Sequence, residues 1–186
     1  ANAQFNLGWM YRNGQGVGRG VTQDYAEAVK WYRKAADQGH AVAQNNLGLM
    51  YDNGQGVTDD ETEAAKWHRL AAEQGEVSAQ SFLGAMYHLG KGVPRDYAEA
   101  VKWYRLAAEQ GYATAQNNLG FMYDYGNGVL QDDVLAHMWY NIAGANGEKN
   151  GSENRGKMEQ VMTREQIADA QARARVCMAS NYQDCD

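Results

Sequence analysis

Apolar side chains recur along the chain with the spacing of amphipathic α-helices. Ala43, Leu47, Met50 and Tyr51 stand at positions i, i+4, i+7 and i+8, which places them on one face of a helix. Glycines interrupt this pattern in residues 53–57, and such clusters mark turns. A second apolar stripe follows each interruption. Because β-branched residues never alternate with polar ones over a useful length, the pattern predicts paired helices and no strands.

The helix pairs recur with a nearly fixed period. Tryptophan returns every 36 residues, at Trp31, Trp67, Trp103 and Trp139. The Leu-Gly pairs are 40, 36 and 36 residues apart and contain Gly8, Gly48, Gly84 and Gly120. The four extra residues of the first interval lie in residues 14–20, where Gly-Gln-Gly-Val is followed by Gly-Arg-Gly-Val. A period of about 20–50 residues is typical of stacked repeat proteins.

Glycine and aspartate mark the helix ends and one point inside each repeat. Asp24, Asp60 and Asp96 are each followed by Glu three positions later, which resembles a capping box at a helix start. Gly39 and its copies stand where a left-handed C-terminal cap is expected. The glycine of each Leu-Gly pair lies within the first helix, where glycine costs about 1 kcal/mol relative to alanine. We therefore expect a bulky tryptophan or tyrosine of the second helix to approach closely there.

The periodicity sets the expected organisation of the chain. We expect an all-α solenoid of four helix-turn-helix repeats in residues 1–39, 40–75, 76–111 and 112–147, since stacking buries faces that one helix pair cannot bury alone. Residues 148–186 depart from the repeat and are expected to cap its end. In them, residues 154–162 and a helix from the capping box Thr163–Gln166 to about Ser180 supply apolar positions. Because residue 1 falls inside the repeat motif, we expect the natural protein to extend upstream.

Composition and charge exclude some classes of function. The chain has 186 residues, 44% of them hydrophobic, and a net charge of −6. No run approaches the ~18 consecutive apolar residues of a membrane span, so membrane insertion is not expected. The acidity argues against nucleic acid as a partner, because phosphates require a basic surface.

Residues that carry chemistry are sparse. The four histidines lack metal-ligand spacing, and no nucleophile or phosphate-binding motif is present, so we expect neither metal nor cofactor. Residues 14–20 follow a helix rather than a strand, which argues against dinucleotide binding. His68 takes the position of Tyr32 and is expected to pack. Cys177 and Cys185 are expected to form a disulfide, which places the protein in a periplasm or outside the cell; the alternative is two free thiols in the cytoplasm.

The repeated motif resembles that of a known family. It reads Ala-x-Ala-Gln-x-x-Leu-Gly-x-Met-Tyr, Gly-x-Gly-Val and Asp-Tyr-x-Glu-Ala-x-Lys-Trp-Tyr-x-x-Ala-Ala-x-Gln-Gly, four times within residues 3–147. The fourth copy departs from it at Asp133, Leu135 and Gly144. The chain resembles bacterial members of the Sel-one-like repeat family, relatives of the tetratricopeptide repeat. This resemblance implies a right-handed α/α superhelix whose first helices line a concave groove, and adaptor or scaffold work on a protein or peptide.

Positions that differ between repeats are the candidates for recognition. Three such rows lie on one face of the first helices. The expected groove residues are Phe5, Trp9, Arg12, Asn45, Leu49, Asp52, Ser81, Ala85, His88, Asn117, Phe121 and Asp124. Aromatic anchors with polar neighbours suit a peptide or helix. The alternative for Trp9, Leu49 and Phe121 is packing against the next repeat.

The sequence leaves two other functions open. One is an enzyme that acts on cell-wall or polysaccharide substrates, with groove carboxylates such as Asp52 and Asp124 as catalytic groups. Cysteine-rich relatives have been linked to β-lactam hydrolysis, but this chain lacks their cysteine pairs within the repeats. The other is a spacer segment of a longer solenoid. We favour a non-enzymatic adaptor that binds a protein or peptide.

Overall fold

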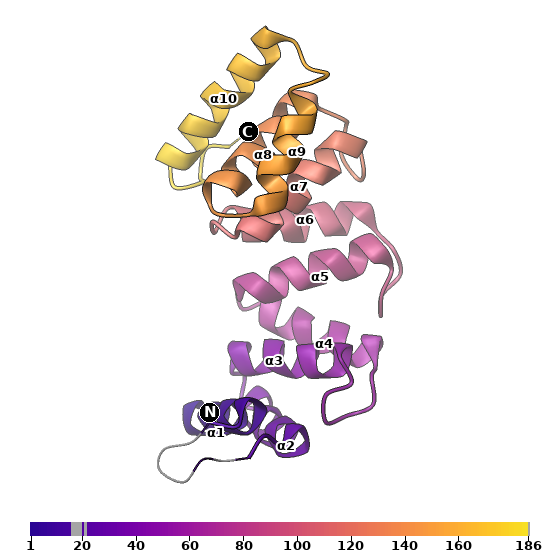
Figure 1. Cartoon of the computed structure of the whole chain (residues 1–186). Helices are drawn as coiled ribbons and strands as arrows, with labels where there is room; N and C mark the ends of the chain where they lie inside the picture. The colour runs from indigo at the N-terminus through magenta and orange to yellow at the C-terminus, as the bar shows by residue number, and fades with distance from the viewer. Residues whose placement is uncertain (16–19, 21, 186) are drawn as a thin grey trace. The chain divides into compact units, whose positions relative to one another are not determined.

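The fold is all-helical. The computed structural model describes residues 1–15, 20 and 22–185, and within them the chain forms ten helices and no strand (Figure 1). The helices are α1 (Asn2–Asn13), α2 (Tyr25–Ala36), α3 (Ala41–Asp52), α4 (Glu61–Ala72), α5 (Val77–Leu89), α6 (Tyr97–Ala108), α7 (Ala113–Tyr125), α8 (Asp133–Ala145), α9 (Lys149–Met158) and α10 (Arg164–Ala179). Residues 16–19 and 21, which hold most of the duplicated tetrapeptide, lie outside the described part.

The helices form two compact units, Ala1–Arg95 and Asp96–Asp186. In the N-terminal unit each helix from α1 to α5 packs on the next. In the C-terminal unit α6 packs on α7 and α7 on α8, while α8 also contacts α9 and α10. Consecutive packing of antiparallel helices is the arrangement of α/α repeats, so the predicted fold class is confirmed.

In the pairs α1–α2, α3–α4 and α7–α8, a glycine of the first helix lies against a ring of the second. A Cβ atom at Gly8 would stand 2.6 Å from Tyr32 Cδ1, and one at Gly48 would stand 2.8 Å from His68. Gly120 has the same relation to Tyr140, at 2.8 Å. The sequence analysis expected either the tryptophan or the tyrosine of the second helix to approach this glycine. The structure shows that it is the residue at the tyrosine position.

The aspartate caps form, but without the full capping box. Asp24 accepts a hydrogen bond from the backbone N–H of Glu27 at 3.0 Å. In a full capping box the Asp24 N–H would donate to the Glu27 side chain. Here it donates instead to the carbonyl of Tyr11, at 2.9 Å. The Glu27 side chain instead pairs with Lys30 at 2.5 Å. A complete capping box is present at α10, as expected, between Thr163 and Gln166.

Buried glutamines join one helix pair to the next. Gln44 of α3 donates to the carbonyl oxygen of Ala36 at the end of α2, at 3.1 Å. Gln80 makes the same bond to Ala72 and Gln116 to Ala108. Arg69 adds a second link by donating to the Tyr87 hydroxyl at 2.7 Å. Each glutamine bond adds a second donor to a carbonyl at a helix end, which also accepts a hydrogen bond from the N–H of the glycine three residues later.

Two helices and a short loop follow α8. We expected the first of these helices in residues 154–162, but α9 begins at Lys149, because Glu148 caps it and Gly151 lies against α8. A Cβ atom at Gly151 would stand 2.8 Å from the Cβ atom of Ala143. The last helix ends at Ala179, close to the expected Ser180.

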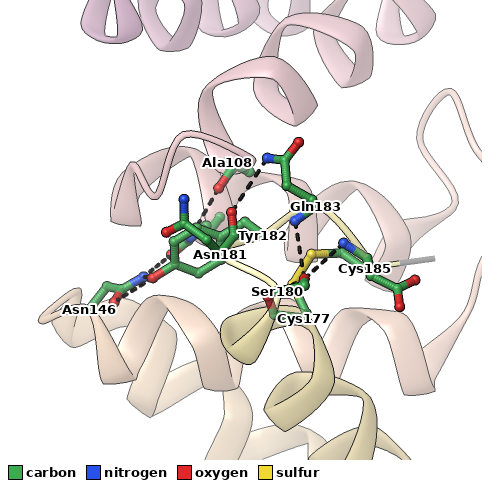
Figure 2. The surroundings of a disulfide bond; sticks show 10 residues. Ala108, Asn146, Cys177, Ser180, Asn181, Tyr182, Gln183 and Cys185 are labelled. Atoms are coloured by element: carbon green, nitrogen blue, oxygen red, sulfur yellow. Dashed lines mark hydrogen bonds between the residues drawn. A yellow bond between two sulfur atoms is a disulfide. The ribbon is translucent and has the colours of Figure 1, made fainter.

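A disulfide closes the loop after α10. Cys177 is buried at the end of the helix and is bonded to Cys185 (Figure 2). Tyr182 of this loop exchanges hydrogen bonds with Asn146 at 2.9 and 3.1 Å. Its ring covers Gly111, where an added Cβ atom would stand 3.0 Å away. The crosslink thus holds a tyrosine against the end of α8.

We predict that Gly120→Ala destabilises the fold by about 1–3 kcal/mol, because the new methyl group would overlap the Tyr140 ring. The matched control is Gly156→Ala in α9, where an added Cβ atom meets no atom within 4 Å. That control should stabilise the fold by up to about 1 kcal/mol through helix propensity. Urea unfolding followed by circular dichroism measures both changes, and equal effects would contradict the close-packing argument.

A second prediction concerns acid. His137 of α8 is buried, and burial lowers its pKa from 6.5, although the nearby Glu159 carboxylate opposes this shift and Arg155 adds to it. The unfolded chain therefore binds a proton at this residue at a higher pH than the folded chain does, so stability falls as pH drops below 6.5. In thermal unfolding between about pH 7 and 5, His137→Gln should flatten the decline of the melting temperature. An unchanged slope would show that other titratable groups, and not His137, cause the decline.

Candidate functional site

The three first helices of the N-terminal unit carry the variable residues at different depths. Trp9 of α1 is 45% exposed, while Leu49 of α3 and Ala85 of α5 are half-buried. In the C-terminal unit, Phe121 is half-buried and lies against Tyr125, with ring centroids 4.4 Å apart. These four residues therefore keep surface that a partner can contact.

In the row two residues before the Leu-Gly pair, two of the four residues are buried. Asn45 and Ser81 are only 6% exposed, and Asn45 Oδ1 lies 2.9 Å from the buried Nδ1 of His68. Phe5 stacks on His40 with centroids 4.9 Å apart and packs on the core. Asn45 and Ser81 therefore offer little surface to a partner, and the edge of α3 that carries Asn45 faces α4. Asn117 is half-buried and accepts a hydrogen bond from Asn154 at 3.2 Å.

The charged row lies four residues after each glycine, and Arg12, Asp52 and Asp124 stand beside the polar end of the ring that packs there. Arg12 lies close to the Tyr32 hydroxyl and donates to Asn46 at 2.9 Å. Asp124 accepts a hydrogen bond from the Tyr140 hydroxyl at 3.2 Å. Burial raises the pKa of Asp124, and the bond from Tyr140 opposes this effect. His88 is half-buried, and burial followed by the charge of Arg95 lowers its pKa.

A pocket of about 320 Å³ lies between α3 and α5. It is lined by Leu49, Asp52, Asn53, Glu61, Phe82, Ala85, Met86, Leu89 and Lys91. Leu49, Asp52 and Ala85 were expected in the groove. The structure therefore brings three variable positions of neighbouring repeats together around one cavity.

The sequence analysis missed several residues of this pocket. Phe82 stands where the other repeats have Asn6, Asn46 and Asn118, and Leu89 stands where they have Asn13, Asn53 and Tyr125. These positions also differ between repeats, and the same comparison extended to them would have found both. Leu89 is 60% exposed, so the third repeat contributes an apolar wall where the second repeat has Asn46 and Asn53.

The charges around the pocket are unevenly compensated. Lys91 Nζ lies 3.7 Å from Glu61 Oε1, and both side chains are more than half exposed. Asp52 Oδ2 lies 3.7 Å from Nε2 of the buried His68, and the Asp52 side chain is 29% exposed. That separation exceeds hydrogen-bond length. The pocket thus joins apolar walls to a carboxylate that His68 approaches without bonding.

Other sites were sought in the part of the chain that the structure describes. Residues 1–15, 20 and 22–185 contain no cluster of three or more His, Cys, Asp and Glu side chains that could hold a metal ion. None of the helices described is both long and apolar enough to cross a membrane.

Comparisons with known proteins place these features in a family. The Sel1 repeat model matches residues 1–40, 41–76, 77–112 and 113–148. A Sel1 repeat protein from Oxalobacter formigenes is 40% identical, with a TM-score of 0.76, over 81% of this chain and 58% of its own. The protective antigen c5321 of uropathogenic Escherichia coli, which displays an SLR fold, is also 40% identical, with a TM-score of 0.82, over 98% of this chain and 42% of its own.

A more distant structure and the curated sequences complete the comparison. Cysteine-rich protein B of Helicobacter pylori shares the fold at 22% identity and a TM-score of 0.56, over 70% of this chain and 94% of its own. No curated protein sequence is similar enough to count as a match. The chain spans about half the length of the first two structures it resembles, 58% and 42%. Since the family model covers most of the chain and both of those structures are 40% identical to it, the chain belongs to the Sel1 repeat family.

Proposed function

We propose that this protein is a non-enzymatic adaptor that binds a peptide segment of another protein through the pocket between α3 and α5. The observation that carries this proposal is the convergence of variable positions on that pocket. Leu49, Ala85 and Phe82 differ in type from their counterparts in the other repeats, yet they line the same cavity. Residues that maintain a repeat fold recur, whereas these do not.

The setting of the pocket supports a peptide as ligand. Sel1 repeats generally serve as protein-interaction scaffolds, typically without catalysis. Apolar walls with a few charged groups match the composition of peptide-binding grooves. The walls stand on helices held by Gly48–His68 packing and by the Gln80 bond to Ala72, so binding orders the partner and not the scaffold.

The disulfide supports an oxidising compartment. Cys177 and Cys185 close a short loop, and structural disulfides persist mainly in periplasmic, secreted or cell-surface proteins. We therefore place the adaptor in the periplasm or outside the cell, in preference to the cytoplasm.

The function is tested with a library of random peptides displayed on phage and selected on the immobilised protein. We predict that enriched peptides bind the wild type and lose about tenfold or more in affinity with Ala85→Trp, because the added ring fills the pocket. The other repeats have Trp9, Leu49 and Phe121 at this position, so the fold should tolerate the change.

The matched control is Leu130→Trp, which adds the same ring at a side chain that is 91% exposed in the C-terminal unit. It should leave the affinity unchanged. Failure to enrich any peptide, or equal binding by Ala85→Trp and the wild type, would refute the proposed site.

A further inference from the structure

We infer that the pocket between α3 and α5 receives a lysine or arginine side chain of the bound peptide, with its cationic group on the carboxylate of Asp52. This inference rests on the proposed peptide-binding function and specifies its ligand. It comes from one residue difference between repeats and from the charges that surround it.

The two equivalent aspartates have different environments. Asp124 and Asp52 each stand four residues after the glycine on which a ring packs. In the C-terminal unit, that ring belongs to Tyr140, whose hydroxyl donates to Asp124 at 3.2 Å. In the N-terminal unit the ring belongs to His68, which is shorter, and its Nε2 atom remains 3.7 Å from Asp52. Replacement of tyrosine by histidine therefore leaves the carboxylate of Asp52 without the internal donor that its counterpart has.

The histidine itself indicates what Asp52 lacks. His68 Nδ1 lies 2.9 Å from the side-chain oxygen of Asn45, an acceptor, so this nitrogen carries the proton in the neutral ring. Nε2 is then an acceptor too, and it is buried without a hydrogen-bond partner while it faces Asp52. Two acceptors that face each other are stabilised by a donor or a positive charge placed near both. The carboxylate, which lines the pocket, is the accessible one of the two.

The rest of the pocket fits the stem of a long cationic side chain. Leu49, Ala85, Met86 and Leu89 supply apolar surface, and lysine and arginine bury their methylene groups along such surfaces while the charged end reaches a partner. Lys91, the pocket's cation, lies 3.7 Å from Glu61. Its charge is thus compensated, and the carboxylate of Asp52 gives the pocket a net attraction for cations in a chain of net charge −6.

The sequences of the selected peptides give the first test. We expect lysine or arginine at one fixed position, next to apolar residues. The best peptide is then titrated calorimetrically, and its affinity should fall about tenfold or more with Asp52→Asn, because a charge-assisted hydrogen bond is lost. The control Asp59→Asn removes the same charge from an exposed residue of the same unit that does not line the pocket, and it should change the affinity less than twofold.

A second variant tests the part played by the ring. His68→Tyr should place a hydroxyl on Asp52, as Tyr140 does on Asp124, and so weaken the peptide several-fold. The fold should be retained, since two other repeats already pack a tyrosine on the same glycine, but the melting temperature should fall slightly because the bond between His68 and Asn45 is lost.

The outcomes separate this inference from the proposed function. The inference would be overturned if the peptides that bind through the pocket lack a cation or carry an acidic residue instead. It would also be overturned if they bind Asp52→Asn as tightly as Asp59→Asn. In either case the proposed peptide-binding function would still stand. Unchanged affinity for His68→Tyr would also overturn the inference. If no peptide binds the wild type, the proposed function and the inference fail together.

Discussion

The contact between a bare glycine Cα and the face of an aromatic or imidazole ring is the constraint on which the repeats depend. It brings the two helices of a pair closer than any residue with a Cβ atom allows, at Gly8, Gly48 and Gly120. The cost of glycine within a helix, about 1 kcal/mol, is offset because a large ring is fully buried. The same contact fixes the direction of the ring, whose polar end therefore points toward the residue four positions after the glycine.

Packing and the proposed recognition are therefore linked through one side chain. The ring that closes the helix pair also determines whether the following residue has an internal partner. Arg12 and Asp124 have a tyrosine hydroxyl beside them, whereas Asp52 has an imidazole that does not reach it. Between successive pairs, bonds such as that of Gln44 to Ala36 keep the helices in register. The scaffold is held by residues that recur, and this leaves the variable positions free to change.

The sequence predicted the features that periodicity and backbone chemistry determine. The helix pairs, the aspartate caps and the left-handed glycines such as Gly39 follow from local rules. The burial of Asn45 does not follow from local rules. Helical spacing places it at the edge of the expected groove, and only the approach of His68 shows that it is buried. The early start of α9 depends on Gly151 against Ala143, a contact between two helices that no local pattern encodes. The pocket itself required two neighbouring repeats to be placed together.

The place of the ring has a consequence for how such arrays diversify. When a repeat is duplicated, its glycine, its ring and the charged residue beside the ring's polar end are copied together. Each copy therefore starts with the same contact between ring and charged residue. Replacement of the tyrosine by histidine removes the hydroxyl beside that charged residue. The packing of the two helices is kept, because both rings pack on the same glycine. If the proposed function holds, specificity can thus change in one repeat while the packing of its neighbours stays as it is.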